Sequence, residues 1–337
     1  MGVTIQEVAL HAGVSVTTVS RVLNNSQQVK EKTKIKVLHI IQELGYHPNA
    51  TAKSLRNKKT MTLGILVPDI NVFIFSEFIK GIERAAQSQN YNVIICDADN
   101  NMVKEHEYLA LLKNQTVDAF VLVFPTISDD LIKEYANEGY RMAVIGRIID
   151  CHNIPCCVTN NVEFSKEIIM HFAKQGHTDI AFISGGQHSN DSIDRLEGYI
   201  QGLKLSQLPF QPELIEDGAF NEKKGYEAFK RIYNKNRNIS AVYAANDEMA
   251  IGVYKACQEL GLRIPDDIAV IGVDDNRMCK YVTPPLSSVK QPNTEMGYLV
   301  TQMFINQLNE ELIKERVIIK ASQIFYRDSS NKLIASY

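Results

Sequence analysis

The sequence predicts an α/β protein with an N-terminal helix-turn-helix head and a larger core of two lobes, each built on a doubly wound parallel sheet. Two observations lead to this prediction. The first 46 residues hold three short segments with helical apolar spacing and a glycine between the first two. From Met61 onward, apolar strands alternate with amphipathic helices, as in parallel sheets covered by helices. With 337 residues, 45% of them hydrophobic, the chain has room for about two or three domains.

The head begins with a capped helix and a tight corner. Thr4 can cap a helix, and Glu7, three residues later, completes a capping box. Gly13 permits a turn that a side chain would obstruct, and Ser15 offers a second cap. The next helix, from Val16 to about Leu23, places Val19, Val22 and Leu23 inward and leaves Val16, Thr17, Ser20 and Arg21 on its outer side. These features predict the first two helices of a helix-turn-helix domain.

A third helix completes the head. We expect it over about Glu31 to Leu44, with Ile35, Leu38 and Ile41 buried and Gly45 ending it. The second helix is then presented outward, because its partners pack behind it. Its short polar residues and one arginine suit base edges and phosphates in a major groove. The predicted DNA-binding residues of the head are Val16, Thr17, Thr18, Ser20 and Arg21.

The charge of the chain is divided between its two parts. Residues 1–60 carry nine lysines and arginines against three acids, a net charge of +6, so the remainder carries −9 of the chain's total of −3. A basic head on an acidic body indicates that only the head binds a polyanion, and the helix-turn-helix pattern of the head indicates double-stranded DNA. A structural three-helix bundle is the alternative, and the basic excess argues against it.

A hinge follows over residues 47–60. A helix of one or two turns from Asn49 to Arg56 is marginal in water, so we expect a disordered linker in the free protein. On DNA the same segment could order, and Leu55 could then wedge between base pairs of the minor groove. The predicted DNA-binding residues of the hinge are Asn49, Ala52, Lys53 and Leu55.

The body contains more strands than one compact sheet holds. They fall into two groups near residue 160, and the carboxyl ends of parallel strands in two such lobes meet around a shared cleft. The predicted strands are 62–67, 91–96, 118–124, 141–146, 179–184, 239–244 and 267–273. The predicted helices between them include 75–89, 162–175, 195–205, 221–234 and 248–260.

Polar and aromatic residues just after these strands are candidates for binding a small effector in the cleft. Carboxylate, amide and guanidinium groups beside aromatic rings suit a polyhydroxylated ligand such as a sugar. Each has a plainer alternative: Asn246 could cap a helix, Arg195, at the start of a helix, could form a structural ion pair, and Phe73 and Phe75 could belong to the core. The candidates are Asp69, Phe73, Phe75, Arg147, Arg195, Phe220, Asn246 and Asp274.

Other classes of protein find little support in the sequence. We see no GxSxG, HExxH or phosphate loop, and the eight histidines do not cluster, so we expect neither an enzyme nor a cofactor. "CHNIPCC" has no second ligand cluster near it, so we expect free thiols and no metal. The absence of a signal peptide and of an apolar run of membrane length predicts a cytoplasmic protein without a membrane partner.

The chain resembles the LacI/GalR family of bacterial transcription regulators over roughly residues 3 to 325. In the head, the matching segments are "VTIQEVALHAGVSVTTVSRVLNN" and "KVLHIIQELGYHPNATAKSL". In the body they are "LGILVPDI", "GHTDIAFISGG", "DRLEGYIQGL", "AANDEMAIGV", "GLRIPDDIAVIGVDD" and "PPLSSVKQP", in that order. The pair "VIGR" and "SNDSIDRLEGY" looks most like maltose-type regulators of Gram-positive bacteria.

This resemblance implies both an architecture and roles for particular residues. The core would be periplasmic-binding-protein-like, with two lobes joined by three crossing strands, and a homodimer would read a pseudo-palindromic operator. Val16, Thr17 and Arg21 would contact bases, and Ala52 and Leu55 would enter the minor groove. The effector pocket would take Phe75, Arg147, Arg195, Phe220, Asn246 and Asp274, with Gln291 near the lobe crossover.

The resemblance also divides the chain and leaves alternatives open. The head would span 1–46, the hinge 47–60 and the core 61–330, with a first lobe of about 61–160 plus 291–325 and a second of about 161–290. Lys30 stands where the family often has a serine cap, and "DINVFIF" replaces the frequent Asn-Pro-Phe-Phe form. The effector could induce or corepress, a protein partner could replace it, and a sugar-binding protein without a DNA role is a further reading.

Overall fold

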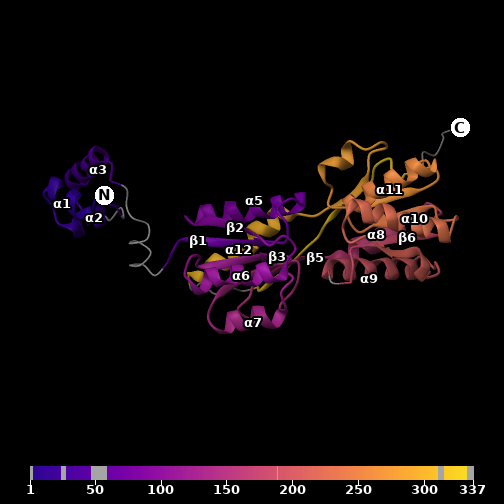
Figure 1. Cartoon of the computed structure of the whole chain (residues 1–337), viewed down its shortest axis with the longest axis horizontal. Coiled ribbons are helices and arrows are strands. Elements are labelled where there is room, and N and C mark those ends of the chain that lie inside the picture. Colours follow the sequence, from indigo (N-terminus) through magenta and orange to yellow (C-terminus); the bar gives the residue numbers. More distant parts are fainter. Residues whose placement is uncertain (1–2, 24–27, 47–58, 188, 310–314, 332–337) are drawn as a thin grey trace. The chain divides into compact units, whose positions relative to one another are not determined.

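A computed structural model of the protein describes residues 3–23, 28–46, 59–187, 189–309 and 315–331. The chain forms two compact units, Met1–Met61 and Thr62–Tyr337 (Figure 1). The first unit is the predicted helical head, and the second is the α/β core. Each unit has a hydrophobic core of its own.

The head folds as three helices, α1 (Ile5–Ala12), α2 (Val16–Leu23) and α3 (Glu31–Leu44). The predicted capping box is present, since the backbone N–H of Thr4 donates to Glu7 at 2.6 Å and that of Glu7 donates to Thr4 Oγ1 at 3.3 Å. Gly13 and Gly45 both take a left-handed φ of 62° after their helices. The corner and both helix ends are thus formed as the sequence predicts.

Helix α3 buries a different face from the predicted one. Ile35 is 61% exposed and Leu38 is 44% exposed, so the expectation that both are buried is wrong. The stripe that packs into the head is Val37 with Ile40, Ile41 and Leu44. That set follows the i, i+3, i+4, i+7 spacing of a helix face, whereas Ile35 and Leu38 lie on the adjoining face. The helix begins at Lys30 without a side-chain cap, as that residue predicts.

The first lobe of the core is a six-stranded parallel sheet in the order β11-β5-β4-β3-β1-β2. Helices α5 and α12 pack closely because glycine stands at their contact: a Cβ on Gly81 would lie 2.0 Å from the carbonyl oxygen of Thr294. The strands are β1 (Thr62–Val67), β2 (Asn92–Asp97), β3 (Ala119–Val123), β4 (Arg141–Ile145), β5 (Cys156–Thr159) and β11 (Val317–Lys320). The helices are α5 (Phe73–Ser88), α6 (Met102–Lys113), α7 (Asp129–Asn137) and α12 (Asn293–Leu308).

The second lobe is a six-stranded sheet in the order β12-β10-β9-β8-β6-β7. All its pairings are parallel except that of β12 with β10, so a single antiparallel strand edges the sheet. The strands are β6 (Ile180–Ser184), β7 (Ile215–Asp217), β8 (Ala241–Ala244), β9 (Ala269–Val273), β10 (Ser287–Lys290) and β12 (Gln323–Phe325). The helices are α8 (Asn161–Lys174), α9 (Asn190–Leu205), α10 (Glu222–Lys235) and α11 (Asp247–Leu260), with 3-10 turns η1 (Pro212–Leu214) and η2 (Arg277–Lys280).

The chain passes between the two sheets three times, which agrees with the three crossing strands implied by the family resemblance. It crosses after β5, after β10 and after β11. Because β12 belongs to the second sheet, the last crossing falls between Lys320 and Gln323, a few residues before the expected boundary near 325. Strands of three or four residues, such as Ser287–Lys290, have too little apolar periodicity to be found by sequence reasoning.

Helix α9 differs from its predicted start. It begins at Asn190 with Ser189 as cap, so Arg195 lies within the helix, and the expectation that Arg195 starts it is wrong. The polar run before Arg195 looks like a loop in the sequence, but Ser189 accepts a hydrogen bond from the backbone N–H of Ser192 at 3.4 Å. The polar first turn then contributes Asp191 to a buried network at the strand ends.

The described part of the chain has no helix that is long and apolar enough to span a membrane. It also has no cluster of histidine, cysteine and acidic side chains that could hold a metal ion. All six cysteines are free, and burial raises the pKa of five of them: Cys96, Cys156, Cys157, Cys257 and Cys279. These thiols belong to the packing of the two lobes.

Candidate DNA-binding and effector sites

Helix α2 divides its residues between the head core and an outer face. Val19 and Val22 are buried, while Val16, Thr17 and Arg21 are exposed. Two more predicted DNA-binding residues, Thr18 and Ser20, are half-buried, and the Thr18 hydroxyl lies 2.9 Å from that of Ser15. The outer face therefore offers short side chains and one guanidinium group, which suits a groove that must be approached closely. The hinge predictions Asn49, Ala52, Lys53 and Leu55 lie outside the described residues.

In the second lobe, Arg195 is the centre of a buried network. Its Nε donates to Asn161 Oδ1 at 2.9 Å, its Nη2 pairs with Asp191 Oδ2 at 3.0 Å, and its Nη1 donates to the carbonyl of Ala245. Only 3% of Arg195 is exposed. Burial raises the pKa of Asp191, and the Arg195 charge opposes that rise. Arg195 thus forms the structural ion pair that the sequence left as an alternative, and these three contacts use three of the five N–H donors of its guanidinium.

Phe220 and Asn246 adjoin Arg195. The guanidinium carbon of Arg195 lies 5.9 Å from the centre of the Phe220 ring, and Asn246 Nδ2 donates to the Phe220 carbonyl at 3.3 Å. Asn246 Oδ1 also accepts from the backbone N–H of Met249 at 3.0 Å, so this residue does cap α11. Gly185 admits the ring, because a Cβ there would lie 2.0 Å from it. The aromatic face and the amide are thereby fixed beside the arginine.

Asp274 and Gln291 meet at the second crossing of the chain. Gln291 Nε2 donates to Asp274 Oδ1 at 3.0 Å, and Gln291 Oε1 accepts from Thr159 Oγ1 at 2.7 Å. Burial raises the pKa of Asp274 to about 8, although the Arg195 charge acts in the opposite direction. Thr159 ends the last strand before the first crossing, so these three side chains connect two crossings with the end of β9.

In the first lobe, Phe75 contacts Phe124, and Phe124 packs against Gly146, the residue before Arg147. The rings of Phe75 and Phe124 are 6.1 Å apart, and Gly146 lies so close to the Phe124 ring that a Cβ would be 2.3 Å from it. Arg147 donates to the carbonyl of Ile127, and its Nε lies 3.2 Å from Asp129 Oδ1. Arg147 is thus anchored to the loop between β3 and α7.

Two predicted effector residues stand apart from these contacts. The Asp69 carboxylate accepts from the backbone N–H of Asn71 at 2.9 Å and from Asn100 Nδ2 at 3.3 Å, so it braces the loop after β1. Phe73 begins α5 and is 54% exposed. The contacts of Asp69 are with its own loop, whereas Arg195, Phe220 and Asn246 form one group and Asp274 joins Gln291.

Several residues at the strand ends hold a backbone conformation that side chains rarely adopt. Phe124, Phe220 and Asp274 have φ values of 47°, 54° and 110°. Such residues persist only where the surrounding structure holds them, and they cluster at binding sites. All three follow the carboxyl ends of parallel strands, the edge at which open α/β sheets bind ligands.

Sequence reasoning missed four residues of this arrangement: Asn161, Asp191, Thr159 and Phe124. Asn161 and Asp191 hold Arg195, Thr159 orients Gln291, and the Phe124 ring packs between Phe75 and Gly146. Asp191 and Arg195 are four residues apart on one helix, a spacing that could have signalled the pair. The others are brought in from distant segments, which no local pattern reveals.

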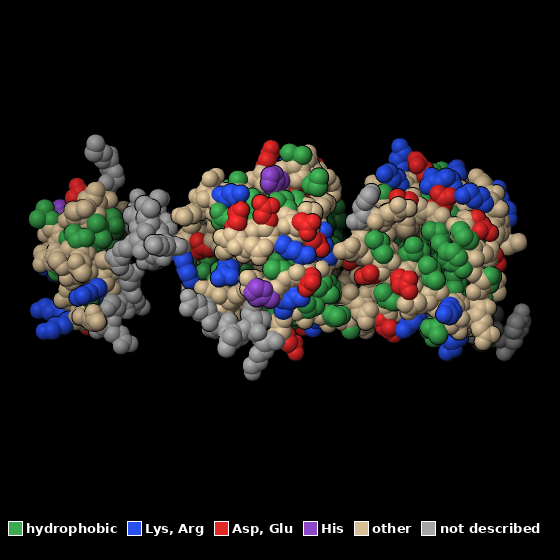
Figure 2. Space-filling model, turned by 90° about the horizontal axis from the view of Figure 1, so that it is seen from below, with side chains coloured by type: hydrophobic (Ala, Val, Ile, Leu, Met, Phe, Trp, Pro, Cys, Tyr) green, Lys and Arg blue, Asp and Glu red, His purple; other side chains and the backbone are tan. Residues whose placement is uncertain are grey.

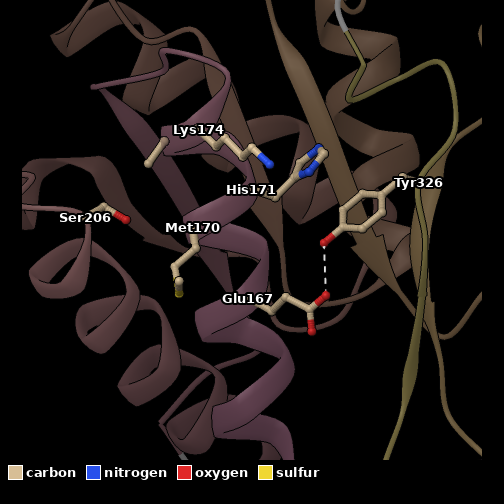
Figure 3. Close-up of a pocket in the computed structure, with 7 residues that line it drawn as sticks. Glu167, Met170, His171, Lys174, Ser206 and Tyr326 are labelled. Carbon is tan, nitrogen blue, oxygen red and sulfur yellow. Dashed lines mark hydrogen bonds between the residues drawn. The ribbon is translucent and has the colours of Figure 1, made fainter.

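A separate surface cavity of about 530 Å³ lies beside α8 in the second lobe (Figure 3). It contains none of the predicted effector residues; its lining is Glu167, Met170, His171, Ala173, Lys174, Ser206 and Tyr326. The His171 ring stacks on Tyr326 at 4.0 Å, and Tyr326 donates to Glu167 at 3.4 Å. On the face shown in Figure 2, apolar side chains gather on this lobe. Among the exposed apolar residues of the lobe are Met170 of α8, 45% exposed, and Leu205 of α9, 60% exposed.

Comparisons with known proteins cover both units of the chain. The family model "Bacterial regulatory proteins, lacI family" matches residues 4–49, and "Periplasmic binding protein-like domain" matches residues 169–330. The probable HTH-type transcriptional repressor ExuR of Bacillus subtilis is 34% identical, over 98% of this chain and 99% of its own length. Catabolite control protein A of Priestia megaterium is 31% identical, over 98% of this chain and all of the relative.

Solved structures agree with this result. The transcriptional regulator CelR in complex with cellobiose is 25% identical, with a TM-score of 0.76, over 97% of this chain and all of that chain. The lac repressor dimer bound to operator and the anti-inducer ONPF, at 24% identity and a TM-score of 0.87, covers 98% of this chain and 99% of its own, and shows the shared fold. The predicted fold class is confirmed, and the chain belongs to the LacI family and is a transcriptional regulator rather than an enzyme.

Proposed function

We propose that this regulator represses carbohydrate-utilisation genes and responds to a small sugar-like effector held at the strand ends of its two lobes. The observation that carries the proposal is the group formed by Arg195, Phe220 and Asn246, with Asp274 and Gln291 beside the second crossing. Guanidinium, carboxylate and amide groups can form paired hydrogen bonds with neighbouring hydroxyls, and an aromatic ring can stack on the apolar face of a sugar. Phe75 and Arg147 would contact the same effector from the first lobe.

Two relatives support a saccharide over other small molecules. CelR, which is 25% identical, was solved with cellobiose. A sugar-binding transcriptional regulator of the LacI family from Escherichia coli, solved with phosphate, is 28% identical over 80% of this chain and 98% of its own, with a TM-score of 0.72. In the present chain, the guanidinium, amide and carboxylate groups at the strand ends are the groups that would bind a saccharide.

The head would bind operator DNA through α2 and the hinge. Val16, Thr17, Thr18, Ser20 and Arg21 would meet base edges and phosphates of the major groove, while Asn49, Ala52, Lys53 and Leu55 would act at the minor groove. The net charge of +6 on residues 1–60 supports an attraction to DNA that weakens as salt rises.

The regulator would act as a homodimer on a pseudo-palindromic operator, because one short helix reads only about half of such a site. An apolar sheet edge supports self-association: β2 is the edge strand of the first sheet, and Ile94 and Ile95 on it are 37% and 42% exposed. We place this dimer in the bacterial cytoplasm, at the nucleoid when bound. Sedimentation that gives only a monomer at micromolar concentration, with and without operator, would contradict the dimer.

A thermal-shift screen tests the effector. The full chain is melted with a panel of monosaccharides and disaccharides that includes cellobiose and maltose, and a ligand of the folded state raises the melting temperature. Each hit is then added to an operator titration followed by fluorescence anisotropy. We expect at least one saccharide to raise the melting temperature and to change operator affinity. If no saccharide does either, a protein partner becomes the better candidate for control.

A further inference from the structure

We infer that Glu105 is a positioning residue for Arg147. Its carboxylate holds the loop between β3 and α7, and the Arg147 guanidinium is bound to that same loop. Glu105 lies on α6, outside every predicted site, and is a carboxylate only 1% exposed. This inference rests on the proposed function in so far as Arg147 is taken as a group that contacts the effector. The placement of Arg147 itself does not depend on that role.

The carboxylate of Glu105 is hydrogen-bonded to two consecutive residues, Thr126 and Ile127. Its two oxygens accept from the backbone N–H of Thr126, at 3.0 and 2.8 Å, and Oε2 also accepts from the backbone N–H of Ile127 at 2.9 Å. The Thr126 hydroxyl adds a fourth bond at 2.9 Å. A buried carboxylate is costly unless hydrogen bonds satisfy it, and here every bond comes from the same two residues.

The same piece of backbone carries Arg147. The carbonyl of Ile127 accepts from the Arg147 guanidinium, and Asp129, two residues on, pairs with Arg147 Nε at 3.2 Å. The N–H of Ile127 is thus bound by Glu105 while its C=O is bound by Arg147. The guanidinium can stay in place only while this loop does.

The loop is also held by packing, since Ile127 is 1% exposed in the core of the first lobe, and the backbone N–H of Phe124 donates to the carbonyl of Ile145 at 2.9 Å. Phe124, at its start, is held at a φ of 47°, a conformation that needs support from its surroundings. Ser128 accepts from the backbone N–H of Leu131 at 3.3 Å and so caps α7, which fixes the far end of the loop. Glu105 reaches the middle of the loop from a helix about twenty residues earlier in the chain. Glu105 therefore fixes the part of the loop that binds the Arg147 guanidinium.

Chemical labelling of the full-length protein tests this assignment without an effector. Phenylglyoxal modifies arginine at a rate that depends on accessibility, and peptide mapping gives the rate at each site. Glu105→Ala should speed modification of Arg147 about tenfold or more, because it removes several bonds to a charged group. Arg141, at the start of β4, the strand that leads to Arg147, should keep its rate. Hydrogen exchange at Thr126 and Ile127 should accelerate by a similar factor.

Two further variants make the test specific. Glu105→Gln can still accept from both backbone amides and donate to the Thr126 hydroxyl, so it should restore most of the wild-type rate at Arg147. Glu107→Ala, at an exposed position on the same helix, should leave every rate unchanged. If Glu105→Ala speeds Arg147 and Arg141 equally, or leaves Arg147 unchanged, Glu105 is a structural residue only and the inference is overturned.

Melting with cellobiose and maltose separates this inference from the proposed function. If one of these sugars raises the melting temperature of the wild type, Glu105→Ala should need about ten times more of that sugar for the same rise. In an Arg147→Ala background, adding Glu105→Ala should not increase the required sugar concentration further. An equal further loss in that background would overturn the inference. If the wild type responds to no saccharide, the proposed effector fails, while the labelling result still decides whether Glu105 positions Arg147.

Discussion

Gln291 Nε2 donates to Asp274 Oδ1 across 3.0 Å, and through its other amide atom Gln291 holds Thr159. Gln291 stands just after β10, where the chain leaves the second sheet for the second of its three crossings. Asp274 follows β9 and belongs to the candidate effector site. One amide therefore joins that site to two of the three segments that connect the lobes.

Gln291→Leu should uncouple the effector from DNA. Leucine keeps most of the volume but leaves Asp274 and Thr159 without this partner. Operator affinity without effector should change little, while the effect of a saccharide on that affinity, typically worth about 1–3 kcal/mol, should disappear. Fluorescence anisotropy with a saccharide from the thermal-shift screen measures both, with exposed Gln87→Leu as control. A normal response in Gln291→Leu would show that this amide carries no signal.

As the pH rises, the free energy of unfolding should fall less in Asp274→Asn than in the wild type. Burial raises the pKa of Asp274 from its ordinary 3.8 to about 8, so between these values the folded protein keeps a proton that the unfolded chain has released. The resulting stabilisation is complete below about pH 4 and is lost as the pH rises through about 8. Asparagine has no such proton. Urea unfolding followed by circular dichroism, at about pH 5 and pH 8, should show a smaller loss in the variant; parallel losses would contradict the raised pKa.

Arg195→Ala should destabilise the second lobe as well as weaken the effector site. Asp191 would lose its charge partner while remaining buried, and breaking a buried pair in this way costs about 3–5 kcal/mol. This differs from a purely ligand-binding arginine, whose removal would leave stability unchanged. Arg237→Ala, at an exposed position of the same lobe, should cost about 0.5 kcal/mol or less in urea unfolding. Equal costs for the two variants would refute the buried pair.

Arg21→Ala should weaken operator binding by about 1–3 kcal/mol, because Arg21 is exposed on the outer face of α2. Binding to random DNA should fall less, since a base contact contributes only to the specific complex. Arg84→Ala, an exposed arginine on α5 of the core, serves as the control. Unchanged operator titrations in Arg21→Ala would mean that α2 is not the recognition helix.

Leu55→Gly should weaken binding to operator and spare random DNA, because the wedge forms only in the specific complex and glycine raises the cost of ordering the hinge. Lys53→Ala should weaken binding to both DNAs alike, as expected for a phosphate contact. Electrophoretic mobility shift with the two duplexes distinguishes the cases. Equal losses for Leu55→Gly on both would argue against a wedge.

The sequence by itself determined the elements that local chemistry specifies. Thr4 with Glu7, Ser15, Gly13 and Gly45 define the ends of the head helices, because caps and left-handed turns need those residues within a few positions. Long apolar strands such as Thr62–Val67 are also evident, since their periodicity is contained in a single segment. These features led to the fold class and to the regulator family.

Only the tertiary structure decided which side chains meet. Asn161 reaches Arg195 from 34 residues away, Thr159 reaches Gln291 from 132 residues away, and Glu105 reaches Ile127 from the preceding helix. It also decided that α3 buries Val37 instead of Ile35, since the phase of a helix against its neighbours is settled by packing. Contacts between distant segments depend on how strands order within a sheet, and no local pattern of residues encodes that order.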